Sequence, residues 1–305
     1  MDDLETLCVR AREWRQDGLA LATVISTWGS APRPKGSHML VNADGRFEGS
    51  VSGGCVESDV LQAAADAIAD GVSRVRSYGV ADDDAWVAGL PCGGEISVLV
   101  QPVGEAGFPP ALFDAIAAAR TAGQRFPVST DLATGLSKTG ATPGQFINDY
   151  LPPRRVLIVG AVQIAQSLAP LCRAIGVSPV LIDPRGRFLT EERFPGVTLD
   201  DRWPDDAITA FAPDAATAVI TLSHDPKIDD PALIAALTAQ TGYIAALGSR
   251  KSQAARLERL GALGFSAADL ARIDGPAGLD IGAVGPAEIA LSIAAGMIQA
   301  FNDRG

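Results

Sequence analysis

Hydrophobic positions in the second half of the chain form short continuous runs separated by stretches with helical spacing. The runs "RVLIVG", "PVLID", "TAVITLS" and "GYIAALG" are typical of buried strands, and segments such as "QIAQSLAPLCRAIG" are typical of helices. Apolar strands that alternate with helices build parallel sheets covered on both faces. The pattern therefore predicts an α/β fold, with a Rossmann-like, doubly wound parallel sheet in this half.

The first half mixes strand and helix patterns. We predict a helix over residues 2–16, strands at "LALATVIST", "HMLVN" and "EISVLVQPV", and a hairpin turn at residues 43–45, where Asp-Gly is flanked by β runs. After Cys55, apolar residues recur every four positions at Val56, Val60, Ala64 and Ile68, as on one face of a helix, and Gly71 is expected just past the helix end. A mixed α/β domain is predicted.

Two consecutive prolines mark the expected boundary between the halves, in "NDYLPPRR", residues 148–155. Proline cannot continue a helix interior or a central strand. We therefore predict an N-terminal domain over residues 1–147 and a Rossmann-like domain over residues 148–305. A chain of 305 residues is long enough for both.

Composition narrows the function classes. Hydrophobic residues make up 47% of the chain, enough for well-buried cores, and the net charge is -11. An acidic surface argues against nucleic acid and anionic membranes as partners. The start, "MDDLE", lacks the pattern of a secretory signal, and no apolar run reaches the ~18 residues of a membrane helix. We expect a cytoplasmic protein in which Cys8 and Cys172, on apolar helical faces, are buried packing residues that form no disulfide.

The turn after "VLIV" has the spacing of a dinucleotide-binding fingerprint, with one departure. Gly160 and Ala165 fit the first and last positions, but Val162 stands where a glycine would leave room for a pyrophosphate. Asp183 could bind a ribose hydroxyl, and Arg185 could instead meet a phosphate. Two interpretations follow: a dinucleotide site of altered geometry, or a scaffold that no longer accepts NAD(P). Val162 favours the scaffold.

Two glycine-cysteine segments carry the strongest candidate chemistry. In "VSGGCVESDV" Cys55 follows a glycine pair at the predicted start of a helix, a position that favours anions and the thiolate form of cysteine. In "GLPCGGEISV" Cys92 precedes a glycine pair and Glu95. If the two loops meet, they form a pocket with two thiols, two carboxylates and backbone amides exposed by the glycines.

Other interpretations of these residues stay open. The glycines could simply make turns, with the cysteines filling space. A zinc site with Cys55, Cys92 and His38 as ligands is a further possibility, although the spacing matches none of the usual ligand patterns. His224, in "LSHDP" after a predicted strand, lies where catalytic side chains of parallel sheets often project.

Six segments together resemble the XdhC/CoxI family of accessory proteins for xanthine dehydrogenase-type molybdenum hydroxylases. They are "GSAPRPKGSHML", "GSVSGGCVESDV", "DDDAWVAGLPCGGEISVLV", "SHDPKIDDPAL", "AALGSRKSQAARLERL" and "IDGPAGLDIGAVGPAEIALSI". The resemblance extends from about Trp14 to Met297 in family order. It departs at Val162, Asp274 and Val284, where the family commonly has Gly, His and a basic residue, all in the second half.

The resemblance implies a non-enzymatic chaperone for the molybdenum cofactor, as molybdopterin or its cytidine dinucleotide form. Such proteins protect the cofactor while it acquires its terminal sulfur and deliver it to the apo molybdenum hydroxylase; a cysteine desulfurase and a second copy of the chain are further expected partners. The expected cofactor-binding residues are Ser52, Gly53, Gly54, Cys55, Glu57, Cys92, Gly93, Gly94, Glu95, Arg33, Lys35, Gly160, Asp183 and Arg185, with Cys55 and Cys92 contacting the metal. The alternatives are an NAD(P)-dependent oxidoreductase using His224 or Asp225, and a silent interaction scaffold.

Overall fold

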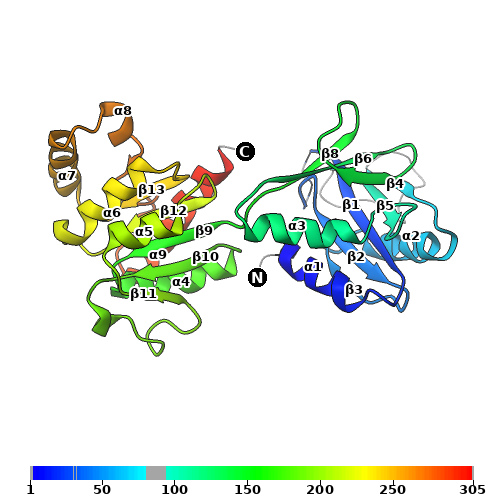
Figure 1. The fold of residues 1–305 in the computed structure, drawn as a ribbon, viewed down its shortest axis with the longest axis horizontal. Coiled ribbons are helices and arrows are strands. Elements are labelled where there is room, and N and C mark those ends of the chain that lie inside the picture. The colour runs from blue at the N-terminus through cyan, green and yellow to red at the C-terminus, as the bar shows by residue number, and fades with distance from the viewer. Residues whose placement is uncertain (1–2, 30, 32, 80–93, 304–305) are drawn as a thin grey trace. The chain divides into compact units, whose positions relative to one another are not determined.

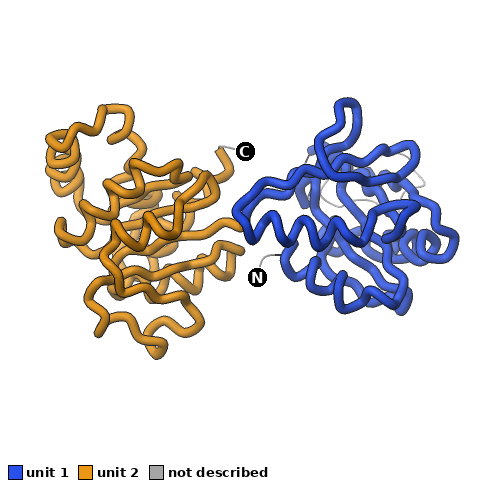
Figure 2. Tube along the Cα trace, viewed as in Figure 1, with its two compact units in different colours: residues 1–152 blue, residues 153–305 orange. Residues whose placement is uncertain are grey.

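The computed structural model describes residues 3–29, 31, 33–79 and 94–303. The chain divides into two compact units, Met1–Pro152 and Pro153–Gly305 (Figure 2). The division falls between Pro152 and Pro153, within the predicted boundary segment "NDYLPPRR". It lies later than residue 147 because the last strand of unit 1 continues to Tyr150 and pairs within that unit.

An antiparallel five-stranded sheet forms the centre of unit 1 (Figure 1). Its order is β3-β2-β1-β5-β4, and the strands are β1 (Leu19–Trp28), β2 (His38–Asn42), β3 (Phe47–Gly49), β4 (Arg74–Tyr78) and β5 (Glu95–Pro102). Because every neighbouring pair is antiparallel, β1, β3 and β4 end where β2 and β5 begin. The chain therefore leaves β1, β3 and β4 and enters β2 and β5 at the same end of the sheet.

Helices cover both faces of this sheet (Figure 1). α2 (Glu57–Asp70) packs small side chains such as Ala63 and Ala64 against one face, and Gly71 ends it in the left-handed conformation (φ 72°), as predicted. α1 (Asp3–Glu13) and α3 (Ala111–Thr121) bury apolar side chains against the other face. The predicted mixed α/β domain is therefore observed.

A three-stranded sheet completes unit 1, in the order β7-β6-β8. Its strands are β6 (Phe126–Asp131), β7 (Leu136–Thr139) and β8 (Phe146–Tyr150). The run "RFPVSTDL" has the pattern of a strand and forms β6, whereas β7 and β8 were not predicted because they are short and bury only some of their residues. Gln101 of β5 donates to the Ser137 hydroxyl of β7 (2.9 Å), so a buried polar contact joins the two sheets.

Unit 2 is built on a parallel six-stranded sheet, in the order β11-β10-β9-β12-β13-β14. The strands are β9 (Arg155–Val159), β10 (Ser178–Ile182), β11 (Thr198–Asp200), β12 (Thr217–Thr221), β13 (Tyr243–Ala246) and β14 (Ile273–Asp274). α4 (Gln163–Ala174) and α9 (Pro286–Asn302) cover one face; α5 (Pro204–Phe211), α6 (Pro226–Thr238), α7 (Arg250–Ala262) and α8 (Ala267–Leu270) cover the other (Figure 1). The doubly wound α/β prediction is confirmed.

The remaining differences from the sequence-based prediction are local. The short elements α5, α8 and β14 were not predicted. The run "PALIAALTAQ" predicts a helix from Pro231, whereas α6 begins at Pro226. Asp225 caps α6 by accepting a hydrogen bond from the Lys227 amide (3.0 Å). In the part of the chain that the structure describes, no helix combines the length and apolar character needed to cross a membrane.

Candidate functional site

A carboxylate at the first position of α2 holds the preceding loop in place. Glu57 accepts hydrogen bonds from the backbone amides of Ser52 (2.9 Å) and Gly54 (2.8 Å) and from the hydroxyl groups of Ser50 (2.6 Å) and Ser52. Burial alone would raise the pKa of Glu57, but these hydrogen bonds outweigh burial and lower the pKa to about 2. Glu57, predicted as a ligand-binding carboxylate, thus fixes the loop.

The loop amides are already bonded inside the protein. Gly53 donates to the Ser50 hydroxyl (2.8 Å), and Cys55 donates to the Ser52 hydroxyl (2.9 Å). Gly53 and Gly54 do adopt the left-handed conformation (φ 77° and 115°), so the glycines are needed for the bend. The expectation that they expose free amides for an anion is corrected: hydroxyl and carboxylate oxygens take those positions.

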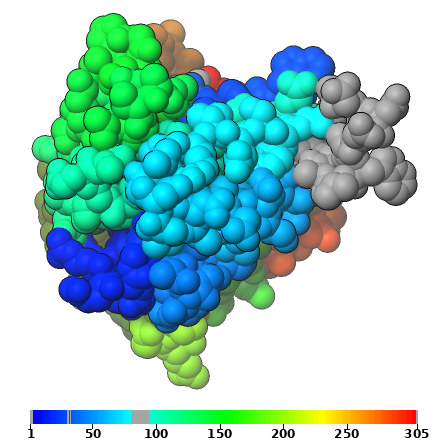
Figure 3. Space-filling view, turned by 90° about the vertical axis from the view of Figure 1, so that its right-hand side faces the viewer, coloured from blue at the N-terminus to red at the C-terminus, as the bar shows by residue number. Residues whose placement is uncertain are grey.

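Cys55 projects from this fixed loop and is exposed. α2 begins at Glu57 with Val56 as its N-cap, so Cys55 lies two positions before the helix. The sequence had suggested a position in the first turn of the helix. Cys8 and Cys172 are buried, as expected, and burial raises the pKa of Cys172 to about 12. Cys55 therefore offers a thiol that a ligand can reach on the surface of unit 1, where α2 lies in cyan in Figure 3.

Other predicted residues of unit 1 belong to the same end of the five-stranded sheet. Arg33 and Lys35 lie in the 29–37 connection, and Glu95 begins β5 directly after the buried Gly94. Cys92 and Gly93 lie outside the described residues, so the approach of Cys92 to Cys55 remains a prediction. The topology brings the described loops to one end of the sheet, and no signal in the local sequence could have predicted this.

His38, at the start of β2, is buried and fully bonded. Its Nδ1 lies 2.9 Å from the Thr23 hydroxyl, and its Nε2 lies 3.0 Å from both the Asn148 amide nitrogen and the Tyr150 hydroxyl. Burial lowers the pKa of His38 to about 4, so the ring is neutral at pH 7. Because both ring nitrogens are engaged, His38 is not available as a zinc ligand beside Cys55. No cluster of metal-ligating side chains occurs within the described ranges.

A cavity of about 290 Å³ opens beside His38. Its wall includes the start of α1, the 33–38 segment, Gly49 and the end of β8. Arg33 and Lys35 both line it, so two of the predicted cofactor-binding side chains share one cavity. Gly49 also lines it, and Ser50, the next residue, begins the loop that carries Cys55. The cavity and the cysteine loop are therefore neighbours along the chain.

The Rossmann turn of unit 2 is held by a buried carboxylate. Gly160 has a φ of 108°, and a Cβ there would lie 2.9 Å from the Ser223 nitrogen, so the turn requires glycine as predicted. Asp183 accepts from the Ala161 amide (2.8 Å) and from the Arg185 guanidinium (2.7 and 2.8 Å). Its side chain is 0% exposed. Asp183 and Arg185 thus bind each other, whereas the sequence suggested that they face a ribose and a phosphate.

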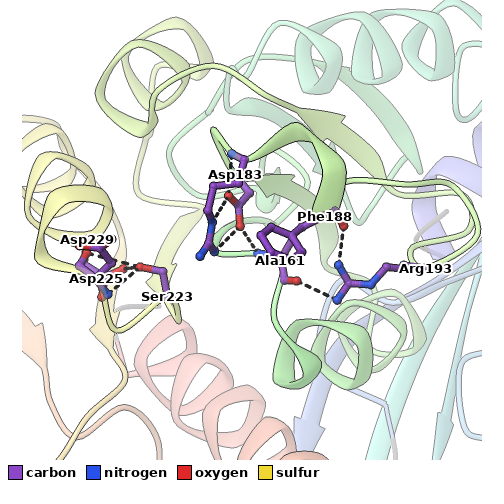
Figure 4. Close-up of polar contacts among 8 residues, drawn as sticks. Ala161, Asp183, Phe188, Arg193, Ser223, Asp225 and Asp229 are labelled. Atoms are coloured by element: carbon purple, nitrogen blue, oxygen red, sulfur yellow. Dashed lines mark hydrogen bonds and ion pairs between the residues drawn. The ribbon is translucent and has the colours of Figure 1, made fainter.

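Figure 4 shows Asp183 turned toward Ala161, with Arg193 on the other side of the turn. The Arg193 guanidinium donates to the carbonyl oxygens of Ala161 (2.9 Å) and Phe188 (2.6 Å). Both polar groups of the Ala161 backbone are therefore occupied. Sequence reasoning missed Arg193, because no motif marks an arginine that reaches back to a turn.

The end of β12 carries the residues considered for oxidoreductase chemistry. His224 is exposed and has a positive φ of 61°, a conformation in which histidine is enriched among non-glycine residues. Its neighbour Asp225 caps α6, and Ser223 donates to the buried Asp229 (2.7 Å; Figure 4). Burial raises the pKa of Asp229, and the hydrogen bond from Ser223 offsets part of that rise. These contacts explain the strand-to-helix turn without a nicotinamide.

Known proteins resemble the chain in both units. Residues 14–79 match the model described as "XdhC and CoxI family", and residues 156–297 match "XdhC Rossmann domain". The molybdenum cofactor insertion chaperone PaoD of Escherichia coli (strain K12) is 31% identical over 282 residues, which cover 91% of this chain and 82% of PaoD. The chain belongs to the XdhC/CoxI family.

Two further relatives of this XdhC/CoxI chain cover both units. A probable xanthine dehydrogenase subunit of Bacillus subtilis (strain 168) is 27% identical, and the match covers 93% of each chain. The crystal structure of a xanthine dehydrogenase from Bacillus halodurans has a TM-score of 0.81 and 26% identity, covering 100% of this chain and 97% of that one. The family resemblance and the fold predicted from the sequence are thus confirmed.

Proposed function

We propose that this protein binds the molybdenum cofactor in unit 1 and inserts it into a molybdenum hydroxylase of the xanthine dehydrogenase type. The name and coverage of PaoD support the chaperone role, and the name of the Bacillus subtilis relative supports the target class. We also propose that the cofactor receives its sulfur before delivery, with a cysteine desulfurase as the sulfur donor.

The exposed Cys55 thiol on a fixed loop is the observation that carries the proposal. Sulfur is a soft ligand suited to a soft or borderline metal centre. Since Glu57 and the serine hydroxyls hold the loop before any ligand arrives, ordering costs little on binding. The Cys55 side chain would contact the metal end of the cofactor, while the occupied loop amides leave its phosphate to side chains elsewhere.

An anaerobic binding titration with isolated molybdenum cofactor tests this proposal. Cys55→Ser keeps the size of the side chain but replaces the soft sulfur, and should weaken binding by about 10-fold or more, the scale of one lost strong polar contact. Ser58→Ala, at an exposed neighbouring position, is the matched control and should bind like the wild type. Cys92→Ser tests the prediction made from sequence alone.

Delivery is measured by activation of an apo molybdenum hydroxylase with the loaded protein. Equal cofactor affinity in the wild type, Cys55→Ser and Ser58→Ala would remove this thiol from the binding site. Failure of the wild-type protein to bind the cofactor at all would overturn the proposed function.

A further inference from the structure

The cavity beside His38 combines an apolar wall with a basic rim. Leu4 and Leu7 of α1 and Leu151, just after β8, form the apolar part. Arg33 and Lys35 supply positive charge. With a volume of about 290 Å³, the cavity is large enough for a small organic group.

The basic side chains have donor capacity that the protein does not use. The Nε atom of Arg33 is buried and has no hydrogen-bond partner among the described residues, an arrangement that usually marks a site for water or an ion. Lys35 lies over the Phe146 ring, 5.1 Å from its centroid, and pairs with no carboxylate in the described ranges. In a chain of net charge -11, these two side chains form a local concentration of positive charge.

Two carboxylates of the cavity wall, Asp3 and Asp149, differ in how exposed their arginine partners leave them. Asp149 is engaged by the Arg125 guanidinium through two hydrogen bonds (2.9 and 2.6 Å). Asp3 pairs with Arg33 Nη2 at 2.7 Å, but the Asp3 side chain is 76% exposed. An exposed ion pair contributes little, so an incoming dianion can displace Asp3 from Arg33.

The inner end of the cavity is neutral and preformed. The His38 ring stacks on Tyr150, with centroids 5.7 Å apart, and the hydrogen bonds between its Nε2 and the side chains of Asn148 and Tyr150 fix its orientation. A neutral floor and leucine side chains suit an uncharged body, whereas the charges of Arg33 and Lys35 suit an anionic group. The lining as a whole therefore suits a ligand that carries both an anionic group and an uncharged body.

We propose that this cavity binds a phosphomonoester with an apolar or aromatic body, its phosphate held by Lys35 and Arg33 in place of Asp3. The proposal deepens the proposed function and rests on it only in assigning the phosphate to the molybdenum cofactor, whose metal end would reach Cys55. The phosphate site itself can be tested without that cofactor.

Isothermal titration with three probes tests the chemistry of the cavity. Phenyl phosphate should bind more tightly than inorganic phosphate because its ring contacts the leucines, and phenol should show no binding because it lacks the dianion. Lys35→Gln should weaken phenyl phosphate binding by about 10-fold, the scale of one charge-assisted hydrogen bond. Lys138→Gln, an exposed lysine on β7, removes the same charge and should change nothing.

The Asp3 competitor gives a prediction of opposite sign. Asp3→Asn releases Arg33 and should tighten phenyl phosphate binding by about two- to five-fold, the scale of an exposed ion pair. Asp44→Asn, which removes another exposed carboxylate from unit 1, should not do so. Because Asp3 and Lys35 are both exposed, these variants are expected to fold, and far-ultraviolet circular dichroism checks this.

The outcomes distinguish a failure of the cavity proposal from a failure of the proposed function. Equal binding of phenyl phosphate by the wild type, Lys35→Gln and Asp3→Asn, or no binding by the wild type, overturns the cavity proposal even if molybdenum cofactor still binds. Phenyl phosphate binding without cofactor binding overturns the proposed function and supports the cavity. Competition between the two ligands assigns the phosphate to the cofactor; independent binding assigns the cavity to another phosphomonoester.

Discussion

The backbone amides that precede helices α2 and α4 are both bonded by a carboxylate of the protein, but the two carboxylates come from different places in the chain. In unit 1, Glu57 accepts backbone and hydroxyl hydrogen bonds from the loop before α2. In unit 2, Asp183 reaches from the end of β10 to the Ala161 amide before α4 and also binds Arg185. In both places a protein carboxylate occupies amides that could otherwise bind a ligand anion.

The difference lies in what each arrangement leaves accessible. Asp183 is fully buried and neutralised by Arg185, and the turn that it holds presents no free polar group at Ala161. Glu57 is only partly buried, has no basic partner among the described residues, and holds a loop from which Cys55 projects. In unit 1 the carboxylate thus supports a loop with an exposed thiol, whereas in unit 2 the carboxylate leaves the turn without a free polar group at Ala161.

The largest expected effect is the loss of Asp183. Asp183→Ala leaves the buried Ala161 amide without its partner, and Arg185 without its carboxylate, so we expect unit 2 to lose about 2–4 kcal/mol of stability. Hydrogen exchange of α4 measures this loss. Asp200→Ala is the matched control, because Asp200 binds Arg202 through the same local contacts but holds no turn amide before a helix. Equal effects would show that the arginine contacts alone matter.

The next largest expected effect is a loss of stability of unit 1 at acidic pH. The pKa of buried His38 is about 4 in the folded protein and near 6.5 when unfolded, so the unfolded state takes up the proton first. Unit 1 is therefore expected to lose about 3 kcal/mol as the pH falls from 6.5 to 4, and no more from this group below that range. Urea unfolding across this range measures the slope.

Matched histidine variants assign this slope. His38→Gln should flatten it, whereas His224→Gln should leave it unchanged, because His224, the other histidine of the chain, is exposed in unit 2. A slope that survives in His38→Gln would contradict the assignment. The Glu57 contribution lies lower: it is present above pH 4.5 and is lost toward about pH 2.

Neutralising Glu57 should have a moderate effect on stability and a clear effect on the cysteine loop. Glu57→Gln keeps the side-chain shape but weakens the hydrogen bonds from Ser50, Ser52 and Gly54, at a cost of about 1–2 kcal/mol for a partly exposed group. A looser loop should raise the alkylation rate of Cys55, followed by peptide mass spectrometry. Glu48→Gln, on β3, is the control. An unchanged rate would show that Glu57 does not fix the loop.

The sequence predicted most of the fold because its signals are local. Apolar runs such as "RVLIV" and the Asp-Gly hairpin encode their own conformations, so the doubly wound sheet and the β2–β3 hairpin follow from periodicity and turn chemistry. Strands β7 and β8 were not predicted because they are short and partly exposed, and the buried polar residue of β7, Ser137, depends on a hydrogen bond from Gln101 of β5. The strand propensity of a segment depends on its local sequence and does not include such tertiary contacts.

The candidate site was predictable in its residues but not in their contacts. The glycines before Cys55 and the basic residues Arg33 and Lys35 could be selected from the sequence, and the structure brings the described loops to one sheet end. The partners of Glu57 and Asp183 could not be selected, because a carboxylate near a glycine turn fits an internal hydrogen bond as well as a ligand contact. Only the fold decides between the two.

The smallest expected effect tests whether Val162 alone closes the turn of unit 2. Val162 is the N-cap of α4 in an extended conformation (φ −92°, ψ 174°), so glycine fits there and should change stability by no more than about 0.5 kcal/mol. Val162→Gly removes the branched side chain but leaves Asp183 and the Ala161 amide bonded to each other. We therefore expect no NADH binding by fluorescence titration. Binding in the micromolar range would mean that the Asp183 contacts yield to a ligand, and the two helix starts would then differ less than their hydrogen bonds indicate.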